Sequence, residues 1–178
     1  MFVNIPGLRN SDDNHWQTIW ERKYPDQFSR IIQEDWAHPN CANWINQIDK
    51  ELKKFDLNKV ILVGHSVGCA AIVNWFQKYK TPIKGIFLVA PSDVDQADYP
   101  KYISGFTPLP LDILPFPSIV VASSNDHVVK LERAKYFAAC WGSEFVVLKN
   151  AGHIEGKSGF GEWTQGFEKL KSLNKNDG

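Results

Sequence analysis

Neither sign of charge predominates in this sequence of 178 residues, which carries 20 basic and 20 acidic side chains. A nucleic-acid-binding protein usually has a basic excess, so we expect no nucleic-acid partner. Long hydrophobic runs are also absent. The longest apolar stretch, Val60–Phe76, is interrupted by Gly64, His65 and Ser66, and it is too short and too polar to span a membrane. We therefore expect no membrane-spanning segment.

Cysteine is scarce, with three residues, Cys41, Cys69 and Cys140, scattered along the chain. An odd and scattered set does not form the pattern of a disulfide framework or a zinc site, and we expect no bound metal. The opening stretch, MFVNIPGLRN, has no basic segment followed by a long apolar one, so no secretory signal is expected. These features predict a reducing, cytoplasmic location, with Cys69 as a buried structural residue.

Linkers, charge blocks and internal repeats are absent as well, so residues 1–178 are predicted to form one domain. Within it, apolar runs typical of strands alternate with helical patterns. The predicted strands are Phe2–Ile5, Phe28–Ile32, Val60–Val63, Ile83–Ala90, Ser118–Ala122 and Phe145–Leu148. The predicted helices are Asn14–Lys23, Asn40–Phe55, Val67–Tyr79, Val129–Trp141 and Gly161–Leu173. Continuous apolar strands separated by helices predict an α/β fold, with a mostly parallel, doubly wound, six-stranded sheet covered on both faces.

One segment, residues 92–117, departs from this alternation because it is long and irregular and carries five prolines. Long connections in compact domains are usually functional or mobile. We predict either a small flap beside the functional site or a surface excursion that is packed for stability. From position alone, Phe106, Leu109 and Leu111 are candidates to line a substrate pocket, and the substrate-binding residues are otherwise unassigned.

Ser66 lies in Gly64-His65-Ser66-Val67-Gly68, a G-x-S-x-G pattern between a predicted strand and a predicted helix. A serine hydroxyl is a useful nucleophile only if it is exposed, close to a base and near donors for the developing oxyanion. A sharp strand-to-helix turn lifts the serine above the sheet, and the small residues Gly64 and Gly68 permit that turn. This context predicts Ser66 as the nucleophile. The alternative is a small residue that only fills a tight turn.

The oxyanion needs backbone donors, and the turn supplies the first candidate. The N–H of Val67 lies at the start of the predicted helix, where the helix dipole favours negative charge. The second donor is expected in the loop after the first strand, Pro6-Gly7-Leu8-Arg9, in which glycine allows close backbone approach. We predict the N–H of Leu8, with that of Arg9 as an alternative. The remaining alternative is a Pro6-Gly7 turn with no catalytic part.

The general base is expected late in the chain, in a loop that follows a strand. His153 fits this position, because it comes just after the sixth predicted strand and after Ala151-Gly152, which lets the backbone approach closely. We expect two other histidines, His15 and His38, to face solvent. His65 precedes the nucleophile, and the turn is expected to point its side chain away from Ser66.

The carboxylate that orients the base is expected at the end of the fifth predicted strand. Asp126 lies there, after the polar turn Ser123-Ser124-Asn125. Its role would be to fix the tautomer of His153 and to stabilise the imidazolium. A helix N-cap is the alternative, since Asp suits that position. Asp93 and Asp95 are rival carboxylates that follow the fourth predicted strand.

Ser66, Asp126 and His153 follow one another in the order Ser–acid–His, each at the carboxyl end of a different predicted strand. With these residues, the Pro6-Gly7 loop and the Gly152-His153 loop, the sequence resembles the α/β-hydrolase superfamily. Within it, the sequence is most similar to the small, lidless serine hydrolases of the retinoblastoma-binding-protein type. The resemblance covers nearly the whole chain. It implies a three-layer α/β/α sandwich with strand order 2-1-3-4-5-6, and hydrolysis of carboxylic esters or related acyl compounds.

We therefore predict a serine hydrolase that acts on a small acyl-containing substrate through an acyl-enzyme, with no metal and no cofactor. One alternative is acyl transfer or thioester hydrolysis by the same three residues, which sequence does not separate from ester hydrolysis. A second alternative is a non-catalytic protein-binding module that keeps the hydrolase fold, and its protein partner would be unknown.

Overall fold

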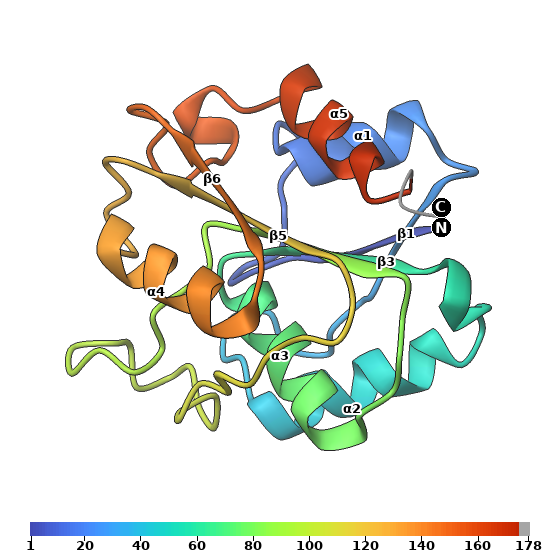
Figure 1. The fold of residues 1–178 in the computed structure, drawn as a ribbon, viewed down its shortest axis with the longest axis horizontal. Helices are drawn as coiled ribbons and strands as arrows, with labels where there is room; N and C mark the ends of the chain where they lie inside the picture. The colour runs from blue at the N-terminus through green and yellow to red at the C-terminus, as the bar shows by residue number, and fades with distance from the viewer. Residues whose placement is uncertain (175–178) are drawn as a thin grey trace.

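The computed structural model describes residues 1–174, and a six-stranded sheet lies at its centre (Figure 1). The strands are β1 (Phe2–Ile5), β2 (Phe28–Arg30), β3 (Ile61–His65), β4 (Gly85–Val89), β5 (Ser118–Ser123) and β6 (Glu144–Leu148). Their order is β2-β1-β3-β4-β5-β6, and every neighbouring pair is parallel. The predicted fold class and strand order are confirmed. Residues 175–178 of the predicted domain lie outside the described residues.

Helices cover both faces of the sheet. They are α1 (Trp16–Lys23), α2 (Cys41–Leu52), α3 (Val67–Tyr79), α4 (Leu131–Trp141) and α5 (Thr164–Ser172), with short 3₁₀ turns η1 (Leu57–Lys59) and η2 (Gly156–Ser158). Helices α1 and α5 lie on one face, and α2, α3 and α4 lie on the other (Figure 1). Each face buries its own hydrophobic cluster, because a parallel sheet is apolar on both sides. No helix within residues 1–174 is long and apolar enough to cross a membrane.

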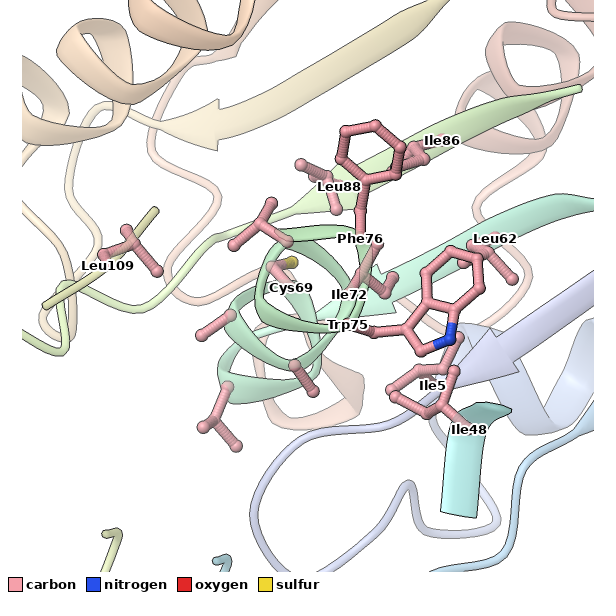
Figure 2. Packing of buried hydrophobic residues seen from close by; sticks show 14 of the residues in the cluster. Ile5, Ile48, Leu62, Cys69, Ile72, Trp75, Phe76, Ile86, Leu88 and Leu109 are labelled. Atoms are coloured by element: carbon pink, nitrogen blue, oxygen red, sulfur yellow. The ribbon is translucent and has the colours of Figure 1, made fainter. Parts of the chain in front are cut away.

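Helix α3 packs tightly between the sheet and α2. Figure 2 shows the ring of Trp75 among Ile5 of β1, Leu62 of β3 and Ile48 of α2. All four side chains are fully buried. Burial of a side chain of this size contributes about 1.5–3 kcal/mol relative to exposure. This packing holds α3, the helix that directly follows Ser66, against the sheet.

Several element ends differ from the predicted ones for local reasons. Helix α1 begins at Trp16 rather than Asn14, because His15 caps it: its Nδ1 atom accepts a hydrogen bond from the N–H of Gln17 at 3.2 Å. Helices α4 and α5 likewise begin two or three residues later than predicted. Hydrophobic periodicity locates an element well but does not show where capping starts it.

Residues 92–117 form no helix and no extended strand, as predicted. Phe106 and Leu109, however, are 2% and 4% exposed and belong to the core cluster that includes α3. Figure 2 shows Leu109 beside α3. Leu111 packs against the same cluster. The prediction that these three residues line the substrate pocket is therefore wrong, because their apolar side chains are used for packing. The carboxylate of Asp95 also accepts the N–H of Leu109 at 3.1 Å, which anchors the segment.

Candidate active site

Ser66 lies in a sharp turn between β3 and α3, with φ of 55° and ψ of −126°. A non-glycine residue rarely adopts this positive φ, and such strained residues cluster at functional sites. The neighbouring glycines have no room for a side chain. A Cβ atom on Gly68 would lie 2.1 Å from the carbonyl oxygen of Ile5, and one on Gly64 would lie 2.8 Å from Cδ1 of Ile72. The turn therefore requires glycine at position 68, where backbone atoms block a side chain. At position 64 a Cβ atom would crowd the end of the Ile72 side chain and lie 3.1 Å from the Cα atom of Cys69.

The hydroxyl of Ser66 contacts the hydroxyl of Ser92, with 3.1 Å between the two Oγ atoms. Ser92 is 1% exposed, and it lines the same cavity as Tyr99. Burial raises the pKa of Tyr99 to about 12, so this phenol stays protonated at neutral pH. In the described part of the chain, no hydrogen bond joins Ser66 to His153. The hydrogen-bond partner of the Ser66 hydroxyl is therefore Ser92.

His153 and Asp126 form a close pair. The Nδ1 atom of His153 lies 3.0 and 2.9 Å from the two carboxylate oxygens of Asp126, and their side chains are 7% and 0% exposed. A carboxylate can only accept, so Nδ1 carries a proton and donates it to Asp126; when the ring carries only this proton, its lone pair is on Nε2. The N–H of Val128 also donates to Asp126 at 2.8 Å. Asp126 is not a helix N-cap, because Lys130 holds that position for α4.

Two backbone donors hold the loops of Asp126 and His153 together. The side-chain oxygen of Asn125 accepts the N–H of Gly152 at 2.8 Å, and the hydroxyl of Ser123 accepts the N–H of Ala151 at 2.9 Å. Ser123 is the last residue of β5 and Asn125 follows it, and the glycine has a positive φ of 56°. The polar turn after β5 therefore aligns the loop that follows β6.

The rival carboxylates have other partners. Asp93 accepts two hydrogen bonds from the guanidinium of Arg133, at 2.7 and 3.0 Å. Asp95 accepts the hydroxyl of Thr107 at 2.6 Å. Neither carboxylate pairs with a histidine in the described residues. Asp126 is thus the one of the three acids that contacts His153.

The loop after β1 lies directly against the serine. A Cβ atom on Gly7 would lie 2.9 Å from Cβ of Ser66, so only glycine permits this approach. The N–H of Arg9 donates to the carbonyl of Trp36 at 2.9 Å and is therefore not free. Within residues 1–174, the N–H groups of Leu8 and Val67 donate no hydrogen bond. These two donors remain available beside Ser66.

Ser66 and His153 open onto one cavity of about 690 Å³. Its lining includes the apolar or aromatic residues Leu8, Val67, Tyr99, Pro100, Ile103 and Val128. The lining also includes the polar or charged residues Arg9, Asp12, Gln96, His127, Glu155 and Lys157. The first part of the 92–117 segment thus lies beside the site. Among the described residues, no group of three or more His, Cys, Asp or Glu side chains could hold a metal ion.

A family profile for serine hydrolases matches residues 2–172. The chain belongs to the serine hydrolase family. A solved YdeN-like hydrolase from Pectobacterium atrosepticum is 36% identical to it, with a TM-score of 0.86, over 98% of this chain and 90% of that chain. The ydeN gene product of B. subtilis is 20% identical, with a TM-score of 0.78, over 98% of both chains. The esterase RhEst1 from Rhodococcus sp. ECU1013 is 14% identical, with a TM-score of 0.69, over 99% of this chain and 90% of that chain.

These comparisons confirm the predicted relationship to the α/β-hydrolase superfamily. The two neighbours with the lower identities show the fold alone. No curated protein sequence matches the chain.

One histidine of this serine hydrolase was expected to face solvent and does not. His15 is 5% exposed, and its ring lies 5.1 Å from that of Trp16 and 4.7 Å from that of His65, between ring centroids. Burial is the main cause that lowers its pKa to about 3. Its Nε2 atom has no hydrogen-bond partner among the described residues. His38 is exposed, as predicted, and pairs with Asp35.

His65 is also buried in this hydrolase, and its ring reaches the loop of His153. Its Nε2 atom lies 2.9 Å from the backbone carbonyl oxygen of His153. A carbonyl can only accept, so Nε2 carries the proton and donates it. Burial holds the pKa of His65 well below its ordinary value, so the ring is neutral at neutral pH.

Ser92 and Tyr99 are site residues of the hydrolase that the sequence did not reveal. A signal for Ser92 was present, because it follows β4 and residues after the carboxyl ends of neighbouring parallel strands converge. Tyr99 carries no such signal. It lies in the irregular segment, where strand order gives no position.

Proposed function

We propose that this serine hydrolase cleaves carboxylic esters or related small acyl compounds, with Ser66 as nucleophile, His153 as general base and Asp126 as the orienting acid. One observation carries the proposal. A histidine paired through Nδ1 with a fully buried carboxylate opens onto the same cavity as a serine held in a strained turn. This is the set of roles that activates a serine hydroxyl.

The reaction would begin when the Ser66 hydroxyl turns from Ser92 toward Nε2 of His153. His153 takes the hydroxyl proton as Oγ attacks the acyl carbonyl carbon. The oxygen of that carbonyl becomes an anion, and the free N–H groups of Val67 and Leu8 would stabilise it. The positive end of the α3 dipole acts in the same direction.

Collapse of this tetrahedral intermediate breaks the bond to the leaving group, which takes the proton from His153 and departs as an alcohol. An acyl-enzyme remains on Ser66. His153 then takes a proton from water as the water attacks the acyl carbon, and the second intermediate releases the carboxylic acid and restores Ser66. Asp126 stabilises the imidazolium in both halves of the reaction.

The solved neighbours support ester substrates in a general way, since RhEst1 is an esterase of the same fold. Apolar side chains, including Leu8, Val67 and Ile103, also line the cavity onto which Ser66 opens and could contact a short acyl chain. The leaving group could be a thiol instead of an alcohol, which would make the reaction thioester hydrolysis. A second alcohol could take the place of water, which would make it acyl transfer. Neither change requires a different set of catalytic residues. The substrate assay therefore includes these cases.

The test is hydrolysis of p-nitrophenyl acetate and butyrate by wild type, Ser66→Ala and His153→Ala. His38→Ala is the matched control, because His38 forms an exposed pair with Asp35 and does not line the cavity. We expect kcat to fall by about 10³-fold or more in the first two variants and to stay at the wild-type value in the control. Wild-type turnover in a folded Ser66→Ala protein would contradict the proposal. Hydrolysis of the corresponding thioester, measured in parallel, distinguishes ester hydrolysis from thioester hydrolysis. Formation of a new ester when alcohols are added to the assay distinguishes acyl transfer from hydrolysis.

A further inference from the structure

The loop that carries His153 is hydrogen-bonded to two buried aromatic rings. Nε2 of His65 donates to the carbonyl oxygen of His153 at 2.9 Å, and Nε1 of Trp16 donates to the next carbonyl, that of Ile154, also at 2.9 Å. His65 is 5% exposed and Trp16 is fully buried. Two consecutive carbonyls in a loop are thus fixed by donors from β3 and α1.

The backbone held in this way is strained. Ile154 has a φ of 51°, a left-handed value that is unfavourable for a β-branched residue. Gly152, on the other side of His153, has a φ of 56°, which glycine adopts without strain. The strained conformation of Ile154 persists only where the surroundings determine it strongly. The hydrogen bonds from His65 and Trp16 hold the backbone of His153 and Ile154 in this conformation, and the side chain of His153 faces Asp126.

His65 has a further connection, because it directly precedes Ser66. Its backbone ends β3, and its side chain reaches the carbonyl of His153 across 88 residues of sequence. Its ring also packs against that of His153, with 4.8 Å between centroids. The same strand end therefore sets the position of the serine and of the histidine backbone.

We propose that His65 and Trp16 are positioning residues for the hydrolytic reaction, whose ring N–H groups fix the His153 backbone so that its imidazole faces both Ser66 and Asp126. The proposal rests on the proposed function for its kinetic consequences. Loss of either donor leaves the strained loop free to relax. A displacement of about 1 Å at a reacting group can cost about 10²-fold in rate.

The variants are chosen to remove the N–H and keep the bulk. His65→Met has a side chain of similar length without a donor, whereas His65→Gln has an N–H the same number of bonds from Cα as Nε2 of His. Trp16→Phe removes the indole N–H and keeps an aromatic ring. Trp20→Phe is the matched control, because Nε1 of Trp20 donates to the carbonyl of Glu162, farther along the same stretch of chain.

For p-nitrophenyl butyrate, we expect kcat to fall about 10- to 100-fold in His65→Met and about 10-fold in Trp16→Phe. We expect KM to change by less than about 3-fold in both, kcat to return to within about 3-fold of wild type in His65→Gln, and Trp20→Phe to keep the wild-type kcat. Circular dichroism confirms folding. Wild-type kcat in folded His65→Met and Trp16→Phe would overturn the proposal. Losses of kcat in His65→Gln and Trp20→Phe as large as those in His65→Met and Trp16→Phe would also overturn it.

A second measurement does not depend on turnover. The ring N–H of a histidine bonded to a carboxylate gives a downfield proton NMR signal, which Asp126→Asn assigns to His153 by its absence. We expect this signal in wild type, His65→Gln and Trp20→Phe, and its loss or broadening in His65→Met and Trp16→Phe. An unchanged signal in the last two would refute positioning even if the wild type hydrolysed no ester. Absent turnover with the expected NMR pattern would refute only the proposed function.

Discussion

The buried imidazole of His15 makes the fold sensitive to acid, and His15→Asn tests this. His15 is 5% exposed and caps α1 through its unprotonated Nδ1 atom. Its pKa is lowered from 6.5 to about 3, mainly by burial. In the unfolded chain the imidazole takes up a proton near its ordinary pKa, whereas in the folded protein it stays neutral to much lower pH.

The direction in which the free energy of unfolding changes with pH follows from proton binding. Between a pH of about 6.5 and about 3 the unfolded state binds more protons than the folded state, so the free energy of unfolding falls as the pH falls. If His15 stays neutral in the folded protein, lowering the pH from 7 to 5 costs about 2 kcal/mol through this one residue. That is a large part of the 5–15 kcal/mol or so that is typical of folded proteins.

Asn at position 15 keeps a side-chain acceptor for the cap and removes the titrating ring. Urea unfolding of wild type, His15→Asn and His38→Asn, followed by tryptophan fluorescence at pH 7 and pH 5, gives the measurement. We expect wild type and His38→Asn to lose about 2 kcal/mol more than His15→Asn between the two pH values. The same loss in all three proteins would refute the reasoning, whatever the stability of His15→Asn at pH 7.

Three further predictions concern the site. Asp126→Asn should lower kcat by about 10³- to 10⁴-fold, because Nδ1 of His153 would lose its carboxylate acceptor; ester turnover near the wild-type rate would contradict this role. Gly68→Ala should lower the free energy of unfolding by about 3 kcal/mol in urea titrations, because its Cβ would lie 2.1 Å from the Ile5 carbonyl oxygen; an unchanged midpoint would show that the turn tolerates a side chain. Iodoacetamide should leave ester hydrolysis intact in the native protein, because Cys69 is fully buried and burial raises the pKa of its thiol; inactivation that follows alkylation of Cys69 would point to a thiol nucleophile.

The sheet could be predicted from the sequence because its four central strands, β1, β3, β4 and β5, are buried on both faces. Val60–Val63 and Ser118–Ala122 are predominantly apolar runs, and the ends of each lie within two residues of those of an observed strand. The order of Ser66, Asp126 and His153 then placed three side chains after three strand ends. Parallel pairing brings strand ends to one edge, so the proximity of Asp126 and His153 follows from topology.

Packing choices could not be predicted in the same way. His15 looks like a surface residue in sequence, yet its burial depends on the rings of Trp16 and His65, which come together only through the fold. Phe106 and Leu109 lie in a segment with no periodicity, and their burial under the core cluster depends on helices elsewhere in the chain. Such positions are set by tertiary contacts, which local pattern does not encode.

The chemical identity of the nucleophile is tested most directly by labelling with a fluorophosphonate probe and mapping the adduct by peptide mass spectrometry. We predict one adduct on Ser66 in wild type, no adduct in Ser66→Ala, and strongly reduced labelling in His153→Ala. Ser92 is the informative competitor, because its hydroxyl lies 3.1 Å from that of Ser66. An adduct on Ser92, or no adduct on a folded wild-type protein, would contradict the assignment of Ser66 as nucleophile.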